Sequence, residues 1–189
     1  MPGISAFAAS TDSKRKIREL TLTAFFAVFT AVCSQIFLPL PFTPVPINCA
    51  LLSVFMAGYI LGSKKGALSQ IVYILLGCAG FPVFANFHGG IGTIIGPTGG
   101  YIVGYIAAGF ISGLFNKSRY HAVIAGLSMI LGLFACYALG VAWFVISAGA
   151  HFLDALSMCV TPFLLGDAVK IIAAVFLSGR LKMLYASVC

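Results

Sequence analysis

Charged residues are excluded from long stretches of this chain. None occurs between Glu19 and Lys64. Of the 189 residues, 61% are hydrophobic and only 8% are charged, whereas an ordinary soluble domain carries about 25% charged residues. A chain this apolar cannot cover its surface with polar side chains, so we expect an integral membrane protein of one domain, in contact with the lipid bilayer.

The positive charges gather in short clusters that flank the apolar stretches. The net charge of +7 would suit a nucleic-acid partner, but clusters beside apolar stretches are typical of the positive-inside rule. We therefore expect no nucleic-acid partner. Only Lys170 stands apart from the clusters, which consist of Lys14, Arg15, Lys16 and Arg18; Lys64 and Lys65; Lys117 and Arg119; and Arg180 and Lys182.

Proline and glycine divide the chain into six expected transmembrane helices. Because six spans put both termini on one side, all the basic clusters can face the cytoplasm. We expect an all-α, N-in/C-in membrane domain over residues 20–182, with a cytoplasmic tail at 1–19 and a C-terminal tail at 183–189, in the bacterial cytoplasmic membrane. The expected helices cover residues 20–38, 47–62, 66–79, 99–116, 121–146 and 160–178, and a proline-rich loop covers 39–46.

Residues 81–101 are rich in glycine and proline and still contain several large apolar side chains. Such a segment does not form a stable spanning helix. Irregular backbone in a membrane protein is tolerated where it lines a cavity or is covered by protein. We therefore expect a structured outer loop between the third and fourth helices that folds over a site.

Asp167 and Lys170 lie within the last apolar segment, three residues apart and thus on one helix face. Ionisable side chains at membrane depth are costly and usually mark a substrate or ion site. We interpret the pair as part of a solute-binding pocket beneath the outer loop. The alternative is an ion pair that only fixes helix packing.

The sequence contains neither the phosphate-binding motif of an ATPase nor a nucleophile with a neighbouring base. An enzymatic activity, a cofactor and a metal are therefore not expected, and energy for transport would have to come from partner subunits. The six cysteines are widely separated and form no CxxC motif, which argues against a zinc site or a disulfide framework.

Small residues recur at four-residue spacing, which allows membrane helices to approach closely. Examples are Gly58 with Gly62 and Gly109 with Gly113. Packing within the chain is one interpretation of each pair. For Ala27 and Ala31 on the first helix, the other interpretation is a docking face for a second membrane subunit.

Three segments in this order resemble the BioY family, the biotin-specific substrate-binding S-components of energy-coupling-factor (ECF) vitamin transporters. The resemblance covers roughly residues 20–182. Its motifs are Pro39-Leu-Pro-Phe-Thr-Pro-Val-Pro46, the stretch from Gly66 to Ala85 with Gly96-Pro-Thr-Gly-Gly-Tyr101, and Pro162-Phe-Leu-Leu-Gly-Asp167-Ala-Val-Lys170.

The resemblance implies a six-helix protein that captures biotin from outside and works with a transmembrane coupling subunit and two ATPase subunits. Asp167 would accept hydrogen bonds from the ureido N–H groups of biotin, and Lys170 would balance that charge or reach the ureido oxygen. The other implied contacts are a polar one to the ureido ring from His88, or from the nearby Asn86, apolar walls from Phe84, Phe87 and Tyr101, and backbone N–H groups near Gly89 and Gly90. Gln70 and Tyr73 either contact the ligand or hydrogen-bond between helices.

The chain departs from the family pattern in two places. Asn48 and Ala50 stand where Thr and Gln are common, and Ile102 stands where some members have Arg. The partner of the ligand's carboxylate is therefore open, with Ser69, Gln70 and backbone amides as candidates. Two other functions stay open: an S-component for another small vitamin, and a structural or assembly membrane protein. An intramembrane enzyme is a more distant alternative.

Overall fold

The computed structural model describes the backbone of residues 3–41, 43, 45–115 and 121–187, and the side chains of 13–41, 43, 45–115 and 121–181. Within these residues the protein is mostly helical. Its helices are α1 (Gly3–Ser34), α2 (Ala50–Leu61), α3 (Ser63–Cys78), the 3₁₀ turn η1 (Ala85–Phe87), α4 (Ile91–Ile95), α5 (Gly99–Ser112), α6 (Ala122–Ala148), α7 (Phe152–Cys159) and α8 (Leu164–Ser187).

The expected all-α fold requires a correction around the proline-rich loop. Phe37–Leu38 (β1) pairs antiparallel with Ile47–Asn48 (β2), with Phe37 opposite Asn48. The first helix therefore ends at Ser34 instead of 38, and the second begins at Ala50 instead of 47. A proline biases the preceding residue toward extended backbone, which suits Leu38 of β1, directly before Pro39.

Each expected helix has a counterpart in α1, α2, α3, α5, α6 or α8, but the bounds differ and α4 and α7 are additional. The segment expected as an N-terminal tail is helical, because α1 begins at Gly3, and α8 continues to Ser187. Residue 116, where the fourth helix was expected to end, lies outside the described residues, as do Lys117 and Arg119.

Two helical stretches among the described residues are long and apolar enough to cross a membrane, Ser13–Ser34 and Ala122–Ala148. The pair α7 and α8, bent by 51° at its break, passes the same test as a single unit. Helices α2 and α5 are apolar but shorter. The six-span count and the N-in/C-in orientation therefore remain predictions.

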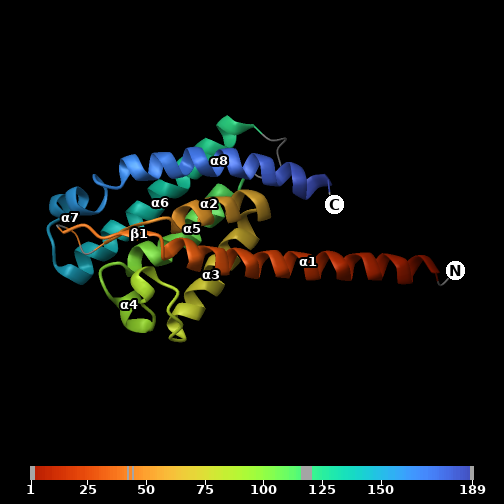
Figure 1. Cartoon of the computed structure of the whole chain (residues 1–189), viewed down its shortest axis with the longest axis horizontal. Helices are drawn as coiled ribbons and strands as arrows, with labels where there is room; N and C mark the ends of the chain where they lie inside the picture. The colour runs from red at the N-terminus through yellow and green to blue at the C-terminus, as the bar shows by residue number, and fades with distance from the viewer. Residues whose placement is uncertain (1–2, 42, 44, 116–120, 188–189) are drawn as a thin grey trace.

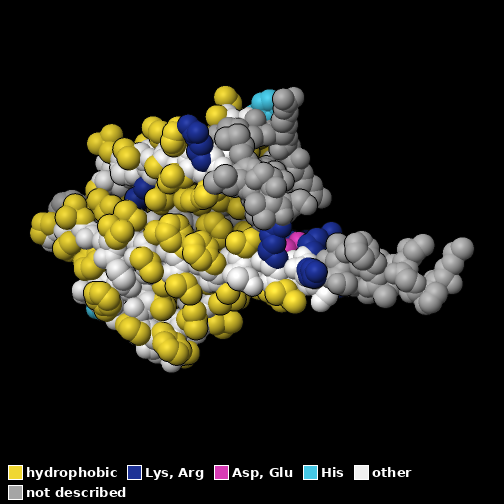
Figure 2. Space-filling view, turned by 45° about the vertical axis from the view of Figure 1, so that its right-hand side comes forward, with side chains coloured by type: hydrophobic (Ala, Val, Ile, Leu, Met, Phe, Trp, Pro, Cys, Tyr) yellow, Lys and Arg dark blue, Asp and Glu magenta, His cyan; other side chains and the backbone are white. Residues whose placement is uncertain are grey.

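The outer surface of the helices is apolar. Leu165 and Ile172 on α8 and Val123 and Ile146 on α6 are 70–84% exposed, and hydrophobic side chains cover most of the visible face in Figure 2. Soluble monomers rarely expose apolar surface on this scale. This surface is suited to lipid, in agreement with the expected membrane protein.

The start of α1 and the end of α8 lie at one end of the molecule, whereas α4, α7 and β1 lie at the other (Figure 1). Lys and Arg side chains gather where α1 leaves the helix bundle, beside an acidic side chain (Figure 2). There, Lys65 Nζ lies 2.6 Å from Glu19 Oε1, so an ion pair links α1 to the first turn of α3.

Helix α2 lies at the centre of the bundle and packs against α1, α3, α5 and α8. The closest approaches between α2 and the neighbouring helices α3 and α5 occur at glycine residues. A Cβ at Gly58 would run into the carbonyl oxygen of Gly109 on α5, and a Cβ at Gly66 on α3 would lie 2.5 Å from the Cα of Gly58. These glycines let three helices meet within the chain, as the packing interpretation predicts.

Candidate functional site

A cavity of about 250 Å³ lies among the proline-rich loop, the loop after α3, and helices α3, α5, α6 and α8. Its volume is close to the lower end of small-molecule pockets, about 300–1,000 Å³. The residues that line it are Phe37, Pro39, Leu40, Thr43, Val45, Pro46, Asn48, Leu51, Tyr73, Phe84, Ala85, Asn86, His88, Thr93, Thr98, Tyr101, Ile102, Tyr105, Tyr137, Phe163, Asp167 and Lys170.

Asp167 lies in the first turn of α8 and is only 1% exposed. The expected helix began near residue 160, but the chain bends between α7 and α8 and α8 begins at Leu164. Asp167 therefore lies about 5 Å along the helix from Leu164. A negative charge in the first turn is favoured by the helix dipole, which offsets part of the cost of burying it.

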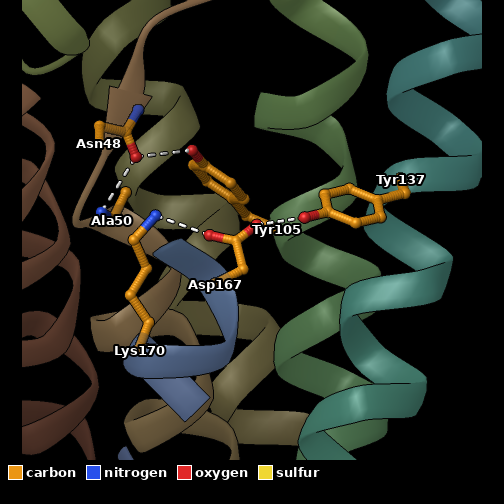
Figure 3. A network of polar contacts seen from close by, with 6 residues as sticks. All are labelled: Asn48, Ala50, Tyr105, Tyr137, Asp167 and Lys170. Atoms are coloured by element: carbon orange, nitrogen blue, oxygen red, sulfur yellow. Dashed lines mark hydrogen bonds and ion pairs between the residues drawn. The ribbon is translucent and has the colours of Figure 1, made fainter. Parts of the chain in front are cut away.

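Both oxygens of the Asp167 carboxylate have partners within the protein. Lys170 Nζ lies 2.7 Å from Oδ1, and the Tyr137 hydroxyl donates to Oδ2 at 2.5 Å. Figure 3 shows the carboxylate held between these two side chains, which come from α8 and α6. A carboxylate has about four lone-pair sites, so this arrangement orients the group and leaves acceptor capacity for a ligand.

Asn48 and Tyr105 form a second polar pair in the cavity lining (Figure 3). The Asn48 Oδ1 atom accepts hydrogen bonds from the Ala50 N–H at 3.1 Å and from the Tyr105 hydroxyl at 3.4 Å. Since that oxygen is occupied, the group that Asn48 can offer a ligand is its NH₂, a donor.

The loop after α3 supplies the cavity wall that includes Phe84, Asn86 and His88. The Phe84 ring is 1% exposed, meets the Tyr73 ring edge to face at 5.5 Å, and covers Gly77, where a Cβ would overlap the ring. Asn86 Nδ2 and His88 Nε2 lie 3.4 Å apart. The expected structured loop thus contributes both an aromatic wall and polar side chains.

Seven of the residues predicted to bind ligand line this cavity, and four do not. Phe87 is 68% exposed, and the Gly90 N–H donates to the Gly77 carbonyl at 2.7 Å, so this amide is already used. Gly89 packs against the backbone at Gly80 and Phe81, where a Cβ has no room. The seven that line the cavity are Asp167, Lys170, His88, Asn86, Phe84, Tyr101 and Tyr73.

Gln70, the fourth residue outside the lining, lies in a buried polar network between α1, α2 and α3. Its Nε2 atom donates to Thr30 Oγ1 at 3.3 Å and to Ser69 Oγ at 3.0 Å, and Thr30 Oγ1 lies 2.9 Å from Ser53 Oγ. Gln70 and Ser69 are fully buried. Their placement favours hydrogen bonding between helices over contact with a ligand carboxylate.

The two alanines predicted to form a docking face on α1 differ in their burial. Ala27 is fully buried in the hydrophobic core, whereas Ala31 is only partly buried at its edge. The neighbouring Val28 and Val32 are 55% and 57% exposed. Packing within the chain therefore accounts for Ala27, and Ala31 alone keeps an accessible surface.

Four aromatic residues of the lining were not anticipated from the sequence: Phe37, Tyr105, Tyr137 and Phe163. Tyr137 lies 30 residues before Asp167 on a different helix. One sequence signal is a tyrosine within an apolar helix, because its hydroxyl requires a hydrogen-bond partner when it is buried. The identity of that partner depends on how α6 packs against α8.

The cavity combines a buried acceptor, cationic and amide donors, and aromatic walls. The acceptor is Asp167, and the donors are Lys170 and the Asn48 amide. Tyr101 is fixed as a wall because its hydroxyl donates to the Cys159 carbonyl at 2.7 Å and its ring lies 6.5 Å from that of Phe163. This arrangement suits a compact, largely apolar ligand that carries N–H donors and an acceptor group.

A model of the BioY family matches residues 8–187. The chain is 40% identical over 168 residues to the probable biotin transporter BioY of Pyrococcus horikoshii. The aligned region covers 88% of this chain and 98% of that protein. The chain is 38% identical over 169 residues to the biotin transporter BioY of Thermotoga maritima, covering 89% and 98%.

A crystal structure described as the S-component for biotin from an ECF-type ABC transporter superposes on this chain with a TM-score of 0.83. The two chains are 29% identical, and the match covers 90% of this chain and 93% of the other. The backbone arrangement of the helices is therefore shared with that protein.

Proposed function

Because the chain belongs to the BioY family, we infer that it is the biotin-binding S-component of a biotin uptake transporter. The observation that carries this inference is the joint match to curated biotin transporters over almost their whole length and to a biotin S-component structure. The chain is a membrane transporter subunit, and biotin is its transported ligand. We further propose the cytoplasmic membrane as its location.

We propose that biotin occupies the cavity with its ureido ring at Asp167. A ureido group has two N–H donors and one carbonyl acceptor, which suits an acceptor-only carboxylate beside an ammonium group. The Asp167–Lys170 ion pair supplies both within one turn of α8. Phe84 and Tyr101 offer apolar surface for the fused rings.

Polar side chains elsewhere in the lining are suited to the remaining groups of biotin. Asn86 and His88 lie close together on the loop after α3, and Asn48 presents a donor amide. We propose them as the groups that bind the valerate carboxylate or its surrounding water. They replace Ser69 and Gln70, which are buried away from the cavity lining.

Purified protein in lipid nanodiscs is expected to bind biotin in the nanomolar range. Ligand that binds only the folded state at a hundredfold excess over Kd stabilises it by about 2.7 kcal/mol, so biotin should raise the unfolding midpoint. Isothermal calorimetry and thermal unfolding would measure both effects. Stabilisation by a different vitamin, with none by biotin, would contradict biotin specificity but would still indicate an S-component for a vitamin. A protein that responds to no vitamin would contradict the proposed function.

We propose that uptake requires a transmembrane coupling subunit and two ATPase subunits, with the basic ends of the chain in the cytoplasm. The shared fold with an ECF-type S-component supports this assembly. The position of the chain ends at one end of the bundle is consistent with the orientation (Figure 1). We further propose that the coupling subunit contacts α1 around Ala31, where a small, partly buried residue lies between two exposed valines.

Substitution Ala31→Trp is therefore expected to reduce biotin uptake by cells strongly while leaving binding by the purified protein unchanged. Val123→Trp on α6 is the matched control, because residue 123 already exposes 74% of its side chain on a different helix and its replacement should affect uptake less. Cell uptake and calorimetric binding separate the two effects. Equal losses of binding and uptake in Ala31→Trp would show that Ala31 serves only the fold.

A further inference from the structure

The cavity wall formed by residues 84–88, here termed the wall segment, is hydrogen-bonded to Gln35, the residue that follows the end of α1. The Gln35 carboxamide donates from Nε2 to the Phe84 carbonyl at 3.0 Å and accepts at Oε1 from the Phe87 N–H at 3.0 Å. Gln35 is half-buried and is absent from the cavity lining. It therefore contacts the wall segment without contributing to the surface that faces a ligand.

These contacts fit only one orientation of the Gln35 amide. Rotating the amide by half a turn would place its carbonyl oxygen against the Phe84 carbonyl and its NH₂ against the Phe87 N–H. The adjacent Ser34 hydroxyl donates to the Val83 carbonyl at 2.6 Å. Ser34, the last residue of α1, and Gln35, which follows it, thus satisfy polar backbone groups in and just before the wall segment.

The backbone of the wall segment needs such support because two consecutive residues adopt left-handed conformations. The φ angles are 59° at Asn86 and 55° at Phe87, and this region is unfavourable for a bulky residue such as Phe. Strained conformations persist where surrounding contacts determine them. The Phe84 N–H closes the turn on the His88 carbonyl at 3.0 Å, and Gln35 supplies the contact from outside.

We propose that Gln35 is a positioning residue, which holds the wall segment closed against the cavity and thereby slows escape of the ligand. This inference rests on the proposed binding of biotin in the cavity. Gln35 acts through Asn86 and His88, the cavity-lining side chains on either side of Phe87. Loss of its amide leaves the Phe87 N–H without its acceptor, so the strained turn relaxes and the cavity opens.

Substitution Gln35→Leu removes the hydrogen bonds to Phe84 and Phe87, together with longer ones to Ala31, Ser34 and Pro82, with little change in side-chain size. In lipid nanodiscs we expect labelled biotin to dissociate about tenfold faster in a chase with unlabelled biotin, while its association rate changes by less than about threefold. Gln35→Glu keeps the acceptor for Phe87 but loses the donor at neutral pH, so its rate should lie between those of parent and Gln35→Leu. The matched control is Ile36→Ala, which truncates a 61% exposed side chain on the neighbouring residue.

A dissociation rate of Gln35→Leu within about twofold of the parent would overturn the proposal. A second measurement does not depend on the ligand: amide hydrogen exchange in peptides that cover residues 81–90 of the ligand-free protein. Faster exchange confined to this region is expected in Gln35→Leu. Unchanged exchange there, or faster exchange throughout α5 and α6, would show that Gln35 does not act on the wall segment specifically. If the parent binds no biotin, the proposed function fails, and the exchange result alone decides the role of Gln35.

Discussion

Substitution Asp167→Asn is expected to weaken biotin binding by about a hundredfold or more. The change leaves Lys170 as an uncompensated cation whose side chain is only 11% exposed, and it brings an amide donor close to the donors Lys170 and Tyr137. Truncating one partner of a buried charge pair costs about 3 kcal/mol or more, which corresponds to this change in Kd. Calorimetric titration of the purified variant with biotin would measure the loss.

The matched control removes both charges, in the double substitution Asp167→Leu with Lys170→Leu. Replacing a buried ion pair by apolar residues is often neutral for folding, so this variant should retain the parental unfolding midpoint yet fail to bind biotin. A stable double variant with parental binding and cell uptake would show that the ion pair is not needed to bind the ligand. That outcome would contradict the site.

The substitution Tyr137→Phe tests how much the orientation of the Asp167 carboxylate, apart from its charge, contributes to biotin binding. The variant keeps the ring and removes only the hydroxyl that donates to Asp167 Oδ2. A hydrogen bond to a charged group contributes about 1.5–3 kcal/mol, so binding should weaken by about tenfold or somewhat more, less than in Asp167→Asn. Parental affinity in this variant would show that Lys170 alone suffices to orient the carboxylate.

The largest effect on folding is expected from Gly58→Ala. The new methyl group would meet the Gly109 carbonyl oxygen and lie 2.9 Å from Ser112 Oγ, so α2 and α5 must separate. Overpacking of this kind costs about 1–3 kcal/mol, and the clash here is with backbone, which cannot rotate away as a side chain can. Alanine favours the helix more than glycine does, which offsets part of this cost. We therefore expect the free energy of unfolding to fall by about 2 kcal/mol. Equilibrium unfolding in mixed detergent micelles would measure it.

Gly126→Ala is the control for that experiment, because it makes the same chemical change inside α6 where space exists. The nearest heavy atom to a Cβ at residue 126 is Val175 Cγ2 at 3.9 Å. This variant should match the parent or gain up to about 1 kcal/mol from helix propensity. Equal destabilisation of both variants would mean that the close helix crossing at Gly58 is not the cause.

Sequence reasoning located residues of the cavity lining most directly where chemistry alone singles out a residue. A carboxylate and an ammonium group in an apolar helix are anomalous wherever that helix packs, so Asp167 and Lys170 could be chosen from the sequence. Gln70 and Phe87 illustrate the limit of this approach. Both belong to segments near the cavity, but helix rotation buries Gln70 among its neighbours, and the left-handed backbone leaves Phe87 exposed.

By itself, the sequence determined that this is a membrane protein, approximately where its helices lie and which charged pair is anomalous, because composition, periodicity and the cost of buried charge are local properties. Only the tertiary structure decided that Tyr137 orients Asp167, that β1 and β2 interrupt the expected helices, and that Gln35 supports the wall segment. These contacts join residues from about ten to more than fifty positions apart. Their partners follow from how helices pack and turns close, which no local pattern specifies.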